Sequence, residues 1–202
     1  MLVLALDTTG PHCSACVARA GEVLAHASER IGRGHAERLA PMVVEVLAQA
    51  GVAPNAVERL AVCTGPGSFT GLRVALSYAK GFALPRRLPV IGIDALGLTL
   101  MAQGEPSLFA HVWADVKRGQ IMWGQYCGPG PLLKGYPKTG DREEMEHSAA
   151  LMQDDIIEAA TPDVALLARI AATLPEDHIE SYPAQPLYAR APDAKLPGGV
   201  SP

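Results

Sequence analysis

The stretch GPGSFTGLRVALSYAKGFAL (65–84) constrains the fold more than any other part of this sequence. It follows LAVCTG (60–65), a continuous apolar run that is typical of a buried strand. Its three glycines allow positive φ angles or a close approach of two backbones, and the apolar spacing after them predicts a helix from about Thr70 to Leu84. A buried strand, a tight loop and a helix in succession predict an α/β fold with helices packed on a sheet.

The segments around this unit extend the same pattern. LVLALD (2–7) is an apolar run that stops at the turn sequence TTGP, and two more strand-like runs, SACVARA and VLAHASERI, follow with a hairpin-sized break between them. PVIGID (89–94) is a further strand-like run. Together these segments predict a three-stranded meander followed by alternating helices and strands, which makes a mixed sheet.

A second amphipathic helix is predicted before the glycine loop, between His35 and Ala50. Gly51 lies where a C-terminal cap belongs. Pro41 predicts that the helix either starts near Arg38 or is kinked there, because proline removes a backbone hydrogen bond. The apolar positions repeat at the helical period and are Leu39, Met42, Val43, Val46, Leu47 and Ala50.

The composition changes after about residue 104. LFAHVWADV and IMWGQY bracket KRGQ as the strands of a hairpin would, and two later segments, SAALMQDDIIEAA and DVALLARIAATL, are predicted to be helices. The tail is rich in proline and is expected to lie on the surface. The predicted parts are an N-terminal lobe at 1–104, a smaller C-terminal α/β lobe at 105–190 and a surface tail at 191–202.

The composition favours a folded protein of the cytoplasm. Hydrophobic residues make up 49% of the chain, yet the apolar stretches fall far short of the roughly 18 to 20 residues that span a bilayer, and MLVLALDTTG lacks the basic leader of a signal peptide. The formal charge of -4 means that a nucleic-acid partner would need a local basic patch. Cys13 and Cys16 form a CxxC, but in a strand they would point to opposite faces, so we expect them reduced and buried.

Polar groups at the end of the first strand and in the glycine loop are the candidates for ligand binding. Asp7, Thr8 and Thr9 close the first strand, and the amides beside Ser68 and Thr70 could receive an anion such as a nucleotide phosphate. The same residues also fit an Asx-type turn, with glycines that let the helix pack tightly on the sheet or on another protein. The sequence leaves both explanations open.

The usual motifs of catalysis and metal binding are missing. Leu72 follows Gly71 in place of the lysine of a Walker loop, and Ser68 lacks the GxSxG elbow of serine hydrolases. The residue four after His35 is Leu39, so no HxxxH pair can chelate zinc. We therefore nominate no catalytic residue and no metal ligand.

Five segments together resemble the TsaB (YeaZ) family of the tRNA threonylcarbamoyladenosine pathway. They are LALDTTG, GHAERLAP, GPGSFTGLRVALSYAKGFAL, DVKRGQI and PLYARAPDAK, and the likeness covers most of residues 1–128 and is patchy up to about residue 186. The resemblance implies an actin-like, RNase H-type α/β fold of two lobes. It also implies a non-catalytic paralogue of TsaD that binds TsaD, is joined by TsaE, and supports threonylcarbamoyl transfer to N6 of adenosine 37 in tRNAs that read ANN codons.

The resemblance further implies where cofactors and partners bind. ATP or ADP and the metal belong to TsaD, and this chain needs no cofactor of its own. Its first two helices are expected to pair with those of TsaD, or with a second copy of the chain. Binding of tRNA is expected mainly through the complex, while Arg33, Arg38, Arg86 and Arg87 either contact it or lie solvated on the surface. The expected partner-binding residues are His35, Arg38, Leu39, Met42, Val43, Val46, Gly71, Leu72 and Leu76.

Two other functions compete with this one. An actin-fold nucleotide hydrolase would use Asp7, Thr8 and the glycine loop, and ATP turnover by the isolated chain would favour it. An M22-type metallopeptidase would hold zinc after purification. TsaD proteins hold their metal with paired histidines on the first helix, and the pairing of His35 with Leu39 departs from that pattern.

Overall fold

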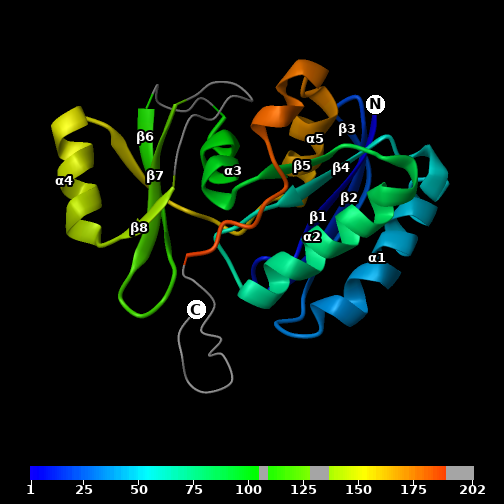
Figure 1. Ribbon diagram of the computed structural model, residues 1–202, viewed down its shortest axis with the longest axis horizontal. Coiled ribbons are helices and arrows are strands. Elements are labelled where there is room, and N and C mark those ends of the chain that lie inside the picture. Colours follow the sequence, from blue (N-terminus) through cyan, green and yellow to red (C-terminus); the bar gives the residue numbers. More distant parts are fainter. Residues whose placement is uncertain (105–108, 128–136, 190–202) are drawn as a thin grey trace.

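The computed structural model describes residues 1–104, 109–127 and 137–189 (Figure 1). These residues form a five-stranded and a four-stranded sheet, which lie toward opposite ends of the molecule with a helix between them. The predicted α/β class, with a mixed sheet, flanking helices and a smaller second lobe, is confirmed. In the described residues no helix is long and apolar enough to span a bilayer.

The first sheet has the strand order β3-β2-β1-β4-β5. Its first three strands form the predicted antiparallel meander, whereas β4 and β5 run parallel to β1. One antiparallel and one parallel side is the arrangement expected of an RNase H-type sheet. The strands are β1 (Leu2–Asp7), β2 (His12–Arg19), β3 (Glu22–Arg30), β4 (Arg59–Cys63) and β5 (Val90–Ile93).

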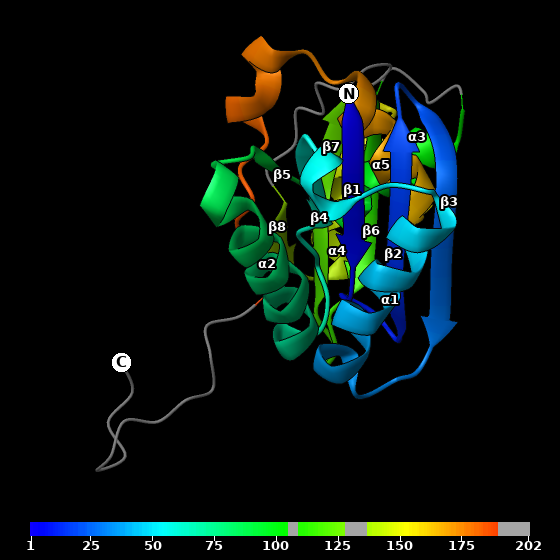
Figure 2. The ribbon, with the colours of Figure 1, turned by 90° about the vertical axis from the view of Figure 1, so that its right-hand side faces the viewer.

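Helices cover both faces of the first sheet. α1 (His35–Gln49) and α2 (Phe69–Ala83) lie side by side on one face (Figure 2), and α5 (Val164–Thr173) packs on the other. Pro41 lies inside α1 on its exposed side, so the helix begins at His35 and not near Arg38. Three short 3-10 helices complete the helical elements: Pro54–Ala56, Leu84–Arg86 and Glu176–Ser181.

Alternation along β2 places its two cysteines on opposite faces of the sheet. Cys13 packs in the cluster that α1 and α2 cover, while Cys16 packs in the cluster that α5 covers. Both thiols are free, and neither is exposed. The prediction that this CxxC points to both faces is confirmed.

A largely apolar helix, α3 (Ala95–Ala102), in which Thr99 is the one polar side chain, lies between the two sheets (Figure 1). Leu98 packs with the first sheet, while Leu96 and Leu100 pack with the second. The helix needs no polar face because both of its sides are buried. Asp94 accepts hydrogen bonds from Gly97 N at the start of α3 and from Tyr126 Oη, both at 2.8 Å, and so joins α3 to the second sheet.

The second sheet has the order β8-β7-β6-β9, and its strands are β6 (Phe109–Asp115), β7 (Ile121–Cys127), β8 (Lys138–Gly140) and β9 (Asp155–Glu158). The predicted hairpin of β6 and β7 is confirmed. The predicted helix across SAALMQDDIIEAA is wrong in its second half, because α4 (Arg142–Met152) ends at Met152 and is capped by Gln153, whose φ of 57° is left-handed. The β-branched pair Ile156 and Ile157 then pairs in parallel with β6.

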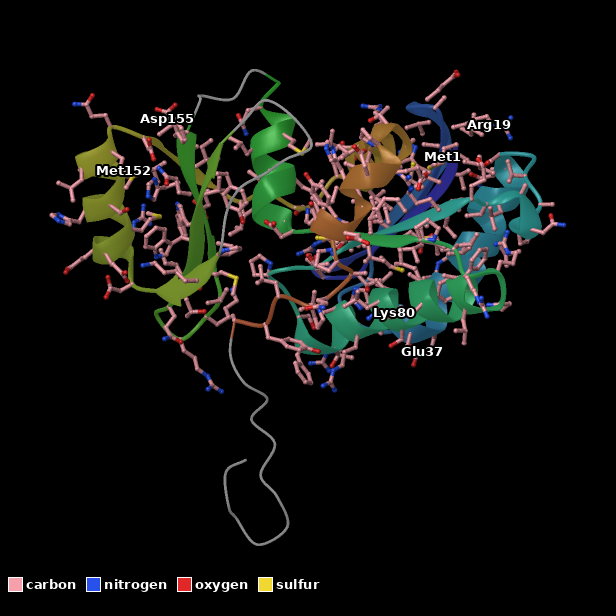
Figure 3. The ribbon with its side chains drawn as sticks, turned by 45° about the horizontal axis from the view of Figure 1, so that its top comes forward. Met1, Arg19, Glu37, Lys80, Met152 and Asp155 are labelled. Atoms are coloured by element: carbon pink, nitrogen blue, oxygen red, sulfur yellow. The ribbon has the colours of Figure 1, made fainter. Side chains whose placement is uncertain are left out.

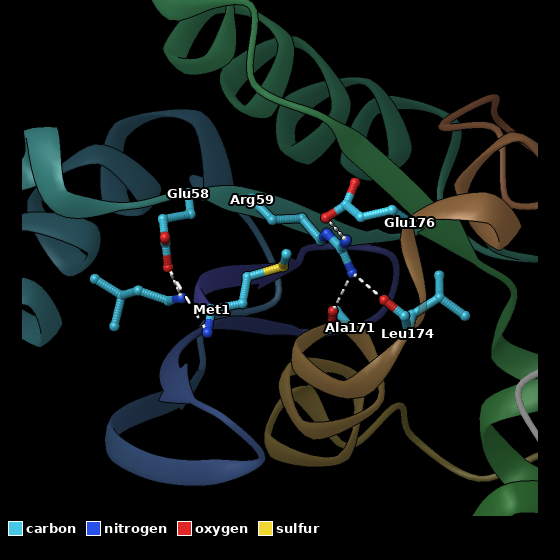
Figure 4. Close-up of polar contacts among 7 residues, drawn as sticks. Met1, Glu58, Arg59, Ala171, Leu174 and Glu176 are labelled. Atoms are coloured by element: carbon cyan, nitrogen blue, oxygen red, sulfur yellow. Dashed lines mark hydrogen bonds and ion pairs between the residues drawn. The ribbon is translucent and has the colours of Figure 1, made fainter.

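The chain returns to the first sheet after β9. The segment that forms α5 was predicted to belong to the second lobe. In the structure, however, α5 packs on β1, β2 and β4 of the first sheet. Arg59, at the start of β4 and fully buried, fixes this return (Figure 4). Its Nη1 donates to the carbonyl oxygens of Ala171 and Leu174 at 2.7 and 2.8 Å, and its Nη2 pairs with Glu176 at 2.7 Å. A buried guanidinium therefore caps the C-terminal end of α5.

Candidate functional site

The glycine loop is bonded directly to the end of β1. Thr8 Oγ1 donates to the Gly71 carbonyl oxygen at 2.6 Å and accepts from Ala75 N at 3.2 Å. Ser68 N donates to the Thr9 carbonyl oxygen at 2.7 Å. The Thr8 hydroxyl and the Ser68 N–H, two donors that a phosphate could otherwise have bound, are thus engaged within the chain.

Two glycines make this contact sterically feasible. A Cβ atom on Gly67 would lie 2.5 Å from the Thr9 carbonyl oxygen, and one on Gly71 would overlap with the Thr8 carbonyl oxygen. Close packing, one of the two explanations that the sequence left open, therefore accounts for these glycines. Gly71 contacts Thr8, just after β1 of its own chain, and is buried, so a direct contact of Gly71 with a partner stays a prediction.

Asp7 lies inside the core, with 1% of its surface exposed. Its Oδ1 accepts from Thr9 N at 2.9 Å and from Thr9 Oγ1 at 2.7 Å, which is an Asx-type turn. Burial raises the pKa of the Asp7 carboxyl, while the hydrogen bonds from Thr9 and the charge of His35 act in the opposite direction. Ser68 Oγ caps α2 by accepting from Gly71 N at 3.3 Å. A nucleotide-binding role for these residues and for the exposed Thr70 stays a prediction.

The apolar side chains that the sequence assigned to a partner face the core of their own lobe. α1 and α2 each have one continuous apolar stripe, and the first sheet covers it. The side chains concerned are exposed by 5% or less, so most of their surface contacts their own lobe, and their contact with a partner stays a prediction. They are Leu39, Met42, Val43, Val46, Leu72 and Leu76.

The outer surface of α1 and α2 instead forms a groove of about 570 Å³. Ala36 and Ser77 are small and exposed, so a second helix could approach the pair closely there. Glu37 on α1 and Lys80 on α2 lie on the outer side of the helix pair (Figure 3). The residues that line the groove are Ala36, Leu39, Phe69, Thr70, Arg73, Val74, Ser77 and Tyr78.

Arg38 is tied into an ion-pair network beside this groove. Its Nε donates to Glu29 at 2.8 Å and its Nη1 donates to Glu45 at 2.9 Å. These hydrogen bonds raise the pKa of the Arg38 guanidinium and lower the pKa of both carboxyls. Arg86 donates to three backbone carbonyl oxygens of the turn at 54–57. Two of the four arginines considered for tRNA contact are thus bonded within the chain.

His35, the other polar residue expected to meet a partner, begins α1 and is partly buried. Its Nε2 has no hydrogen-bond partner among the residues that the structure describes. Leu39, one helical turn later, is 1% exposed. Over the described ranges, no three His, Cys, Asp or Glu side chains come together in a metal-binding arrangement.

A polar cluster that sequence reasoning missed lies inside the second lobe. His111 Nε2 is 3.0 Å from Ser148 Oγ on α4, and His111 Nδ1 is 3.1 Å from Asp154 Oδ2. Gln125 Nε2 also donates to Asp154, at 2.6 Å. Burial lowers the pKa of His111, and the Asp154 carboxylate opposes that shift. These residues come from β6, β7, α4 and the turn before β9, so no spacing along the sequence could have revealed them.

The contacts of His111 with Ser148 on one side and Asp154 on the other resemble the catalytic triad of serine hydrolases. Their oxyanion hole needs free N–H groups beside the nucleophile. Ser148 lies in the middle of α4, where helical hydrogen bonds occupy the neighbouring N–H groups. The cluster is therefore best explained as a polar connection that holds α4 against β6.

Comparison with known proteins places these features in a family. Residues 23–131 match the family model described as TsaD: tRNA N6-adenosine threonylcarbamoyltransferase. The tRNA threonylcarbamoyladenosine biosynthesis protein TsaB of Escherichia coli is 38% identical over 130 residues, which are 62% of this chain and 55% of that protein. The TsaB of Haemophilus influenzae is 45% identical over 103 residues, covering 51% of this chain and 42% of that protein. The chain thus spans about half the length of these TsaB proteins.

Other proteins match over more than nine-tenths of their length. An uncharacterized protein of Mycobacterium tuberculosis is 33% identical over 217 residues, which are 96% of this chain and 93% of that protein. The solved structure of YeaZ from Pseudomonas aeruginosa superposes with a TM-score of 0.74 at 24% identity, and the match covers 93% of this chain and 99% of that one. The likeness to the solved structure establishes that the two share a fold.

Proposed function

The chain belongs to the TsaB (YeaZ) family, and we propose that it is a non-catalytic subunit that binds TsaD through the groove of α1 and α2. In that complex it supports the transfer of a threonylcarbamoyl group to N6 of adenosine 37 in tRNAs that read ANN codons. TsaE joins the pair, and TsaD supplies the nucleotide, the metal and the reacting groups. The complex works in the cytoplasm, and tRNA binds mainly through it.

The observation that carries this proposal is the match between this chain and the TsaD family model. The matched residues 23–131 include α1, α2 and the glycine loop. A TsaD protein would then carry a comparable helix pair on a comparable sheet, so the two proteins can pack these helices together about a pseudo-twofold axis. A second copy of this chain could use the same face when TsaD is absent.

Two features of the site favour a subunit without chemistry of its own. Thr8 and Ser68 are hydrogen-bonded to neighbouring residues of their own chain. His35 is followed one turn later by the buried Leu39. The groove, by contrast, offers small and apolar residues, which suit helix packing better than they suit a reaction.

The proposal is tested by measuring binding to purified TsaD of the same organism. Ser77→Arg and Ala36→Arg place a long charged side chain in the groove, and each should weaken binding at least tenfold. Ala48→Arg is the matched control, because Ala48 is an exposed residue of α1 outside the groove lining. Equal binding by all three variants and the unaltered chain would reject the groove as the interface.

A tRNA modification assay tests the role within the complex. With TsaD, TsaE and the enzyme that makes the threonylcarbamoyl adenylate present, leaving this chain out should abolish modification. Adding back the Ser77→Arg variant should fail to restore it, while the Ala48→Arg variant should succeed. Full activity without the chain, or modification by the chain alone, contradicts the proposed role.

A further inference from the structure

The last described segment, residues 182–189, connects the two lobes, and we call it the crossing segment. It begins against the edge strand β5 of the first sheet, where Gly92 N donates to the Tyr182 carbonyl oxygen at 2.9 Å. A Cβ atom on Gly92 would lie 2.7 Å from the Pro183 carbonyl oxygen, so the absence of a side chain there makes room for the segment. The start of the crossing segment is thus fixed to the first sheet.

The rest of the crossing segment is bonded to both lobes. Leu187 N donates to the Thr64 carbonyl oxygen, just after β4, at 2.8 Å. Thr139 Oγ1 on β8 donates to the Ala189 carbonyl oxygen at 2.9 Å. Leu187 and Ala189 also pack against the apolar core of the second lobe. A shift of the second lobe would therefore be transmitted to this segment.

Between these two attachments, Tyr188 reaches the start of α2. Its ring lies 5.0 Å from the ring of Phe69, measured between centroids. Its hydroxyl accepts a hydrogen bond from Arg73 Nε at 3.1 Å. The Arg73 guanidinium in turn lies 3.8 Å from the centroid of the Phe69 ring. Phe69 and Arg73 line the groove of α1 and α2, so the crossing segment supports one end of that groove.

The contacts of Arg73 indicate what should bind there. Arg73 is exposed, and it makes no ion pair with any residue in the described parts of the chain. Its Nε is engaged by Tyr188, and its two Nη groups remain for a ligand. A guanidinium held beside an apolar groove favours a carboxylate, because a charge-assisted hydrogen bond gains strength as docking removes water.

We propose that the crossing segment is part of the surface that binds TsaD, and that Tyr188 is a positioning residue. It holds Arg73 so that the guanidinium meets a carboxylate on the docked helices of TsaD. This inference rests on the proposed function and adds a specific requirement to it. Because the same segment is bonded to the second lobe, the position of that lobe influences how well TsaD binds.

The test is a double-mutant cycle on the affinity for purified TsaD. Tyr188→Ala and Arg73→Ala should each weaken binding about tenfold, and Tyr188→Ala should add little in a chain that already carries Arg73→Ala. Tyr188→Phe keeps the ring and loses only the hydroxyl, so its effect should be smaller. Gln185→Ala is the control, since Gln185 is exposed on the same segment and does not line the groove. Affinity should fall with added salt for the unaltered chain and much less so for Arg73→Ala.

Each outcome decides the inference. Additive losses from Tyr188→Ala and Arg73→Ala overturn the positioning role. Unchanged binding by Tyr188→Ala overturns the inference but leaves the proposed function intact, provided that Ser77→Arg still blocks TsaD. An unaltered chain that does not bind TsaD, or that binds only a second copy of itself, overturns both. Thermal melting of each variant checks the fold, and Tyr188→Phe replaces Tyr188→Ala if the latter does not fold.

Discussion

The cores of the two lobes rely on different interactions. In the first sheet, β1 and β4 are buried along their whole length, and apolar side chains from helices cover both faces. In the second sheet, β6 carries the buried His111, which contacts Ser148 and Asp154 and lies 5.4 Å from the ring of Trp123. Apolar packing is most sensitive to added volume where no space remains, whereas a polar network is sensitive to the loss or protonation of a single member. The two lobes should therefore respond differently to substitution and to pH.

The largest effect is expected where the first lobe has no space at all. Gly71→Ala puts a methyl group into the Thr8 carbonyl oxygen at the contact between α2 and β1, and we expect it to cost about 3 kcal/mol or more in the free energy of unfolding. Urea unfolding followed by circular dichroism measures this. Gly81→Ala is a matched control on the same helix, because a Cβ there meets nothing within 4 Å. It should raise the stability by up to about 1 kcal/mol.

If Gly81→Ala lowered the free energy of unfolding more than Gly71→Ala does, the loop would be held less closely than the contacts indicate. A Gly71→Ala protein that keeps its stability but loses TsaD would instead place Gly71 at the interface. The pair thus separates a role in folding from a role in assembly.

A smaller effect is expected from the loss of the buried Arg59 guanidinium in the first lobe. Arg59→Met keeps most of the side-chain volume but leaves the carbonyl oxygens of Ala171 and Leu174 without their donor. We expect a loss of about 2 kcal/mol, with faster hydrogen exchange confined to α5. Arg19→Met, at the exposed end of β2, is the control. Similar exchange rates in α5 for both variants would contradict the capping role of Arg59.

The first lobe could be predicted from sequence because its elements are encoded locally. Continuous apolar runs such as LVLALD mark strands that are buried on both faces, and single apolar stripes mark helices with one buried face. The glycine loop was likewise located correctly. Its purpose was not decided by the sequence, because tight packing and anion binding need the same glycines, and only the contact between Gly71 and Thr8 distinguishes them.

The predictions that failed depend on contacts between distant residues. The helical pattern of α4 predicted that the helix continues through DDII. In the structure β9 forms there instead, because these residues pair with β6. The sequence could not divide the apolar side chains of α1 and α2 between the sheet and a partner, because no local feature tells whether a sheet or another protein covers a given side of a helix. The partners of Arg73 and His111 likewise come from segments far away in the chain.

The effect of pH on His111 is the smallest change that we expect, and it belongs to the second lobe. Burial lowers the pKa of His111 in the folded protein, whereas the unfolded chain should titrate near the ordinary value of about 6.5. Below that pH the unfolded state binds more protons than the folded state does, so the stability of the lobe falls as the pH drops, until the folded-state pKa is passed. Hydrogen exchange of β6 and α4, compared about one unit above and about one unit below the ordinary histidine pKa, measures this loss. His111→Gln should remove the pH dependence, and His147→Gln, on the exposed side of α4, should retain it. If both variants keep the same dependence, another group titrates and the buried cluster does not make the second lobe sensitive to acid.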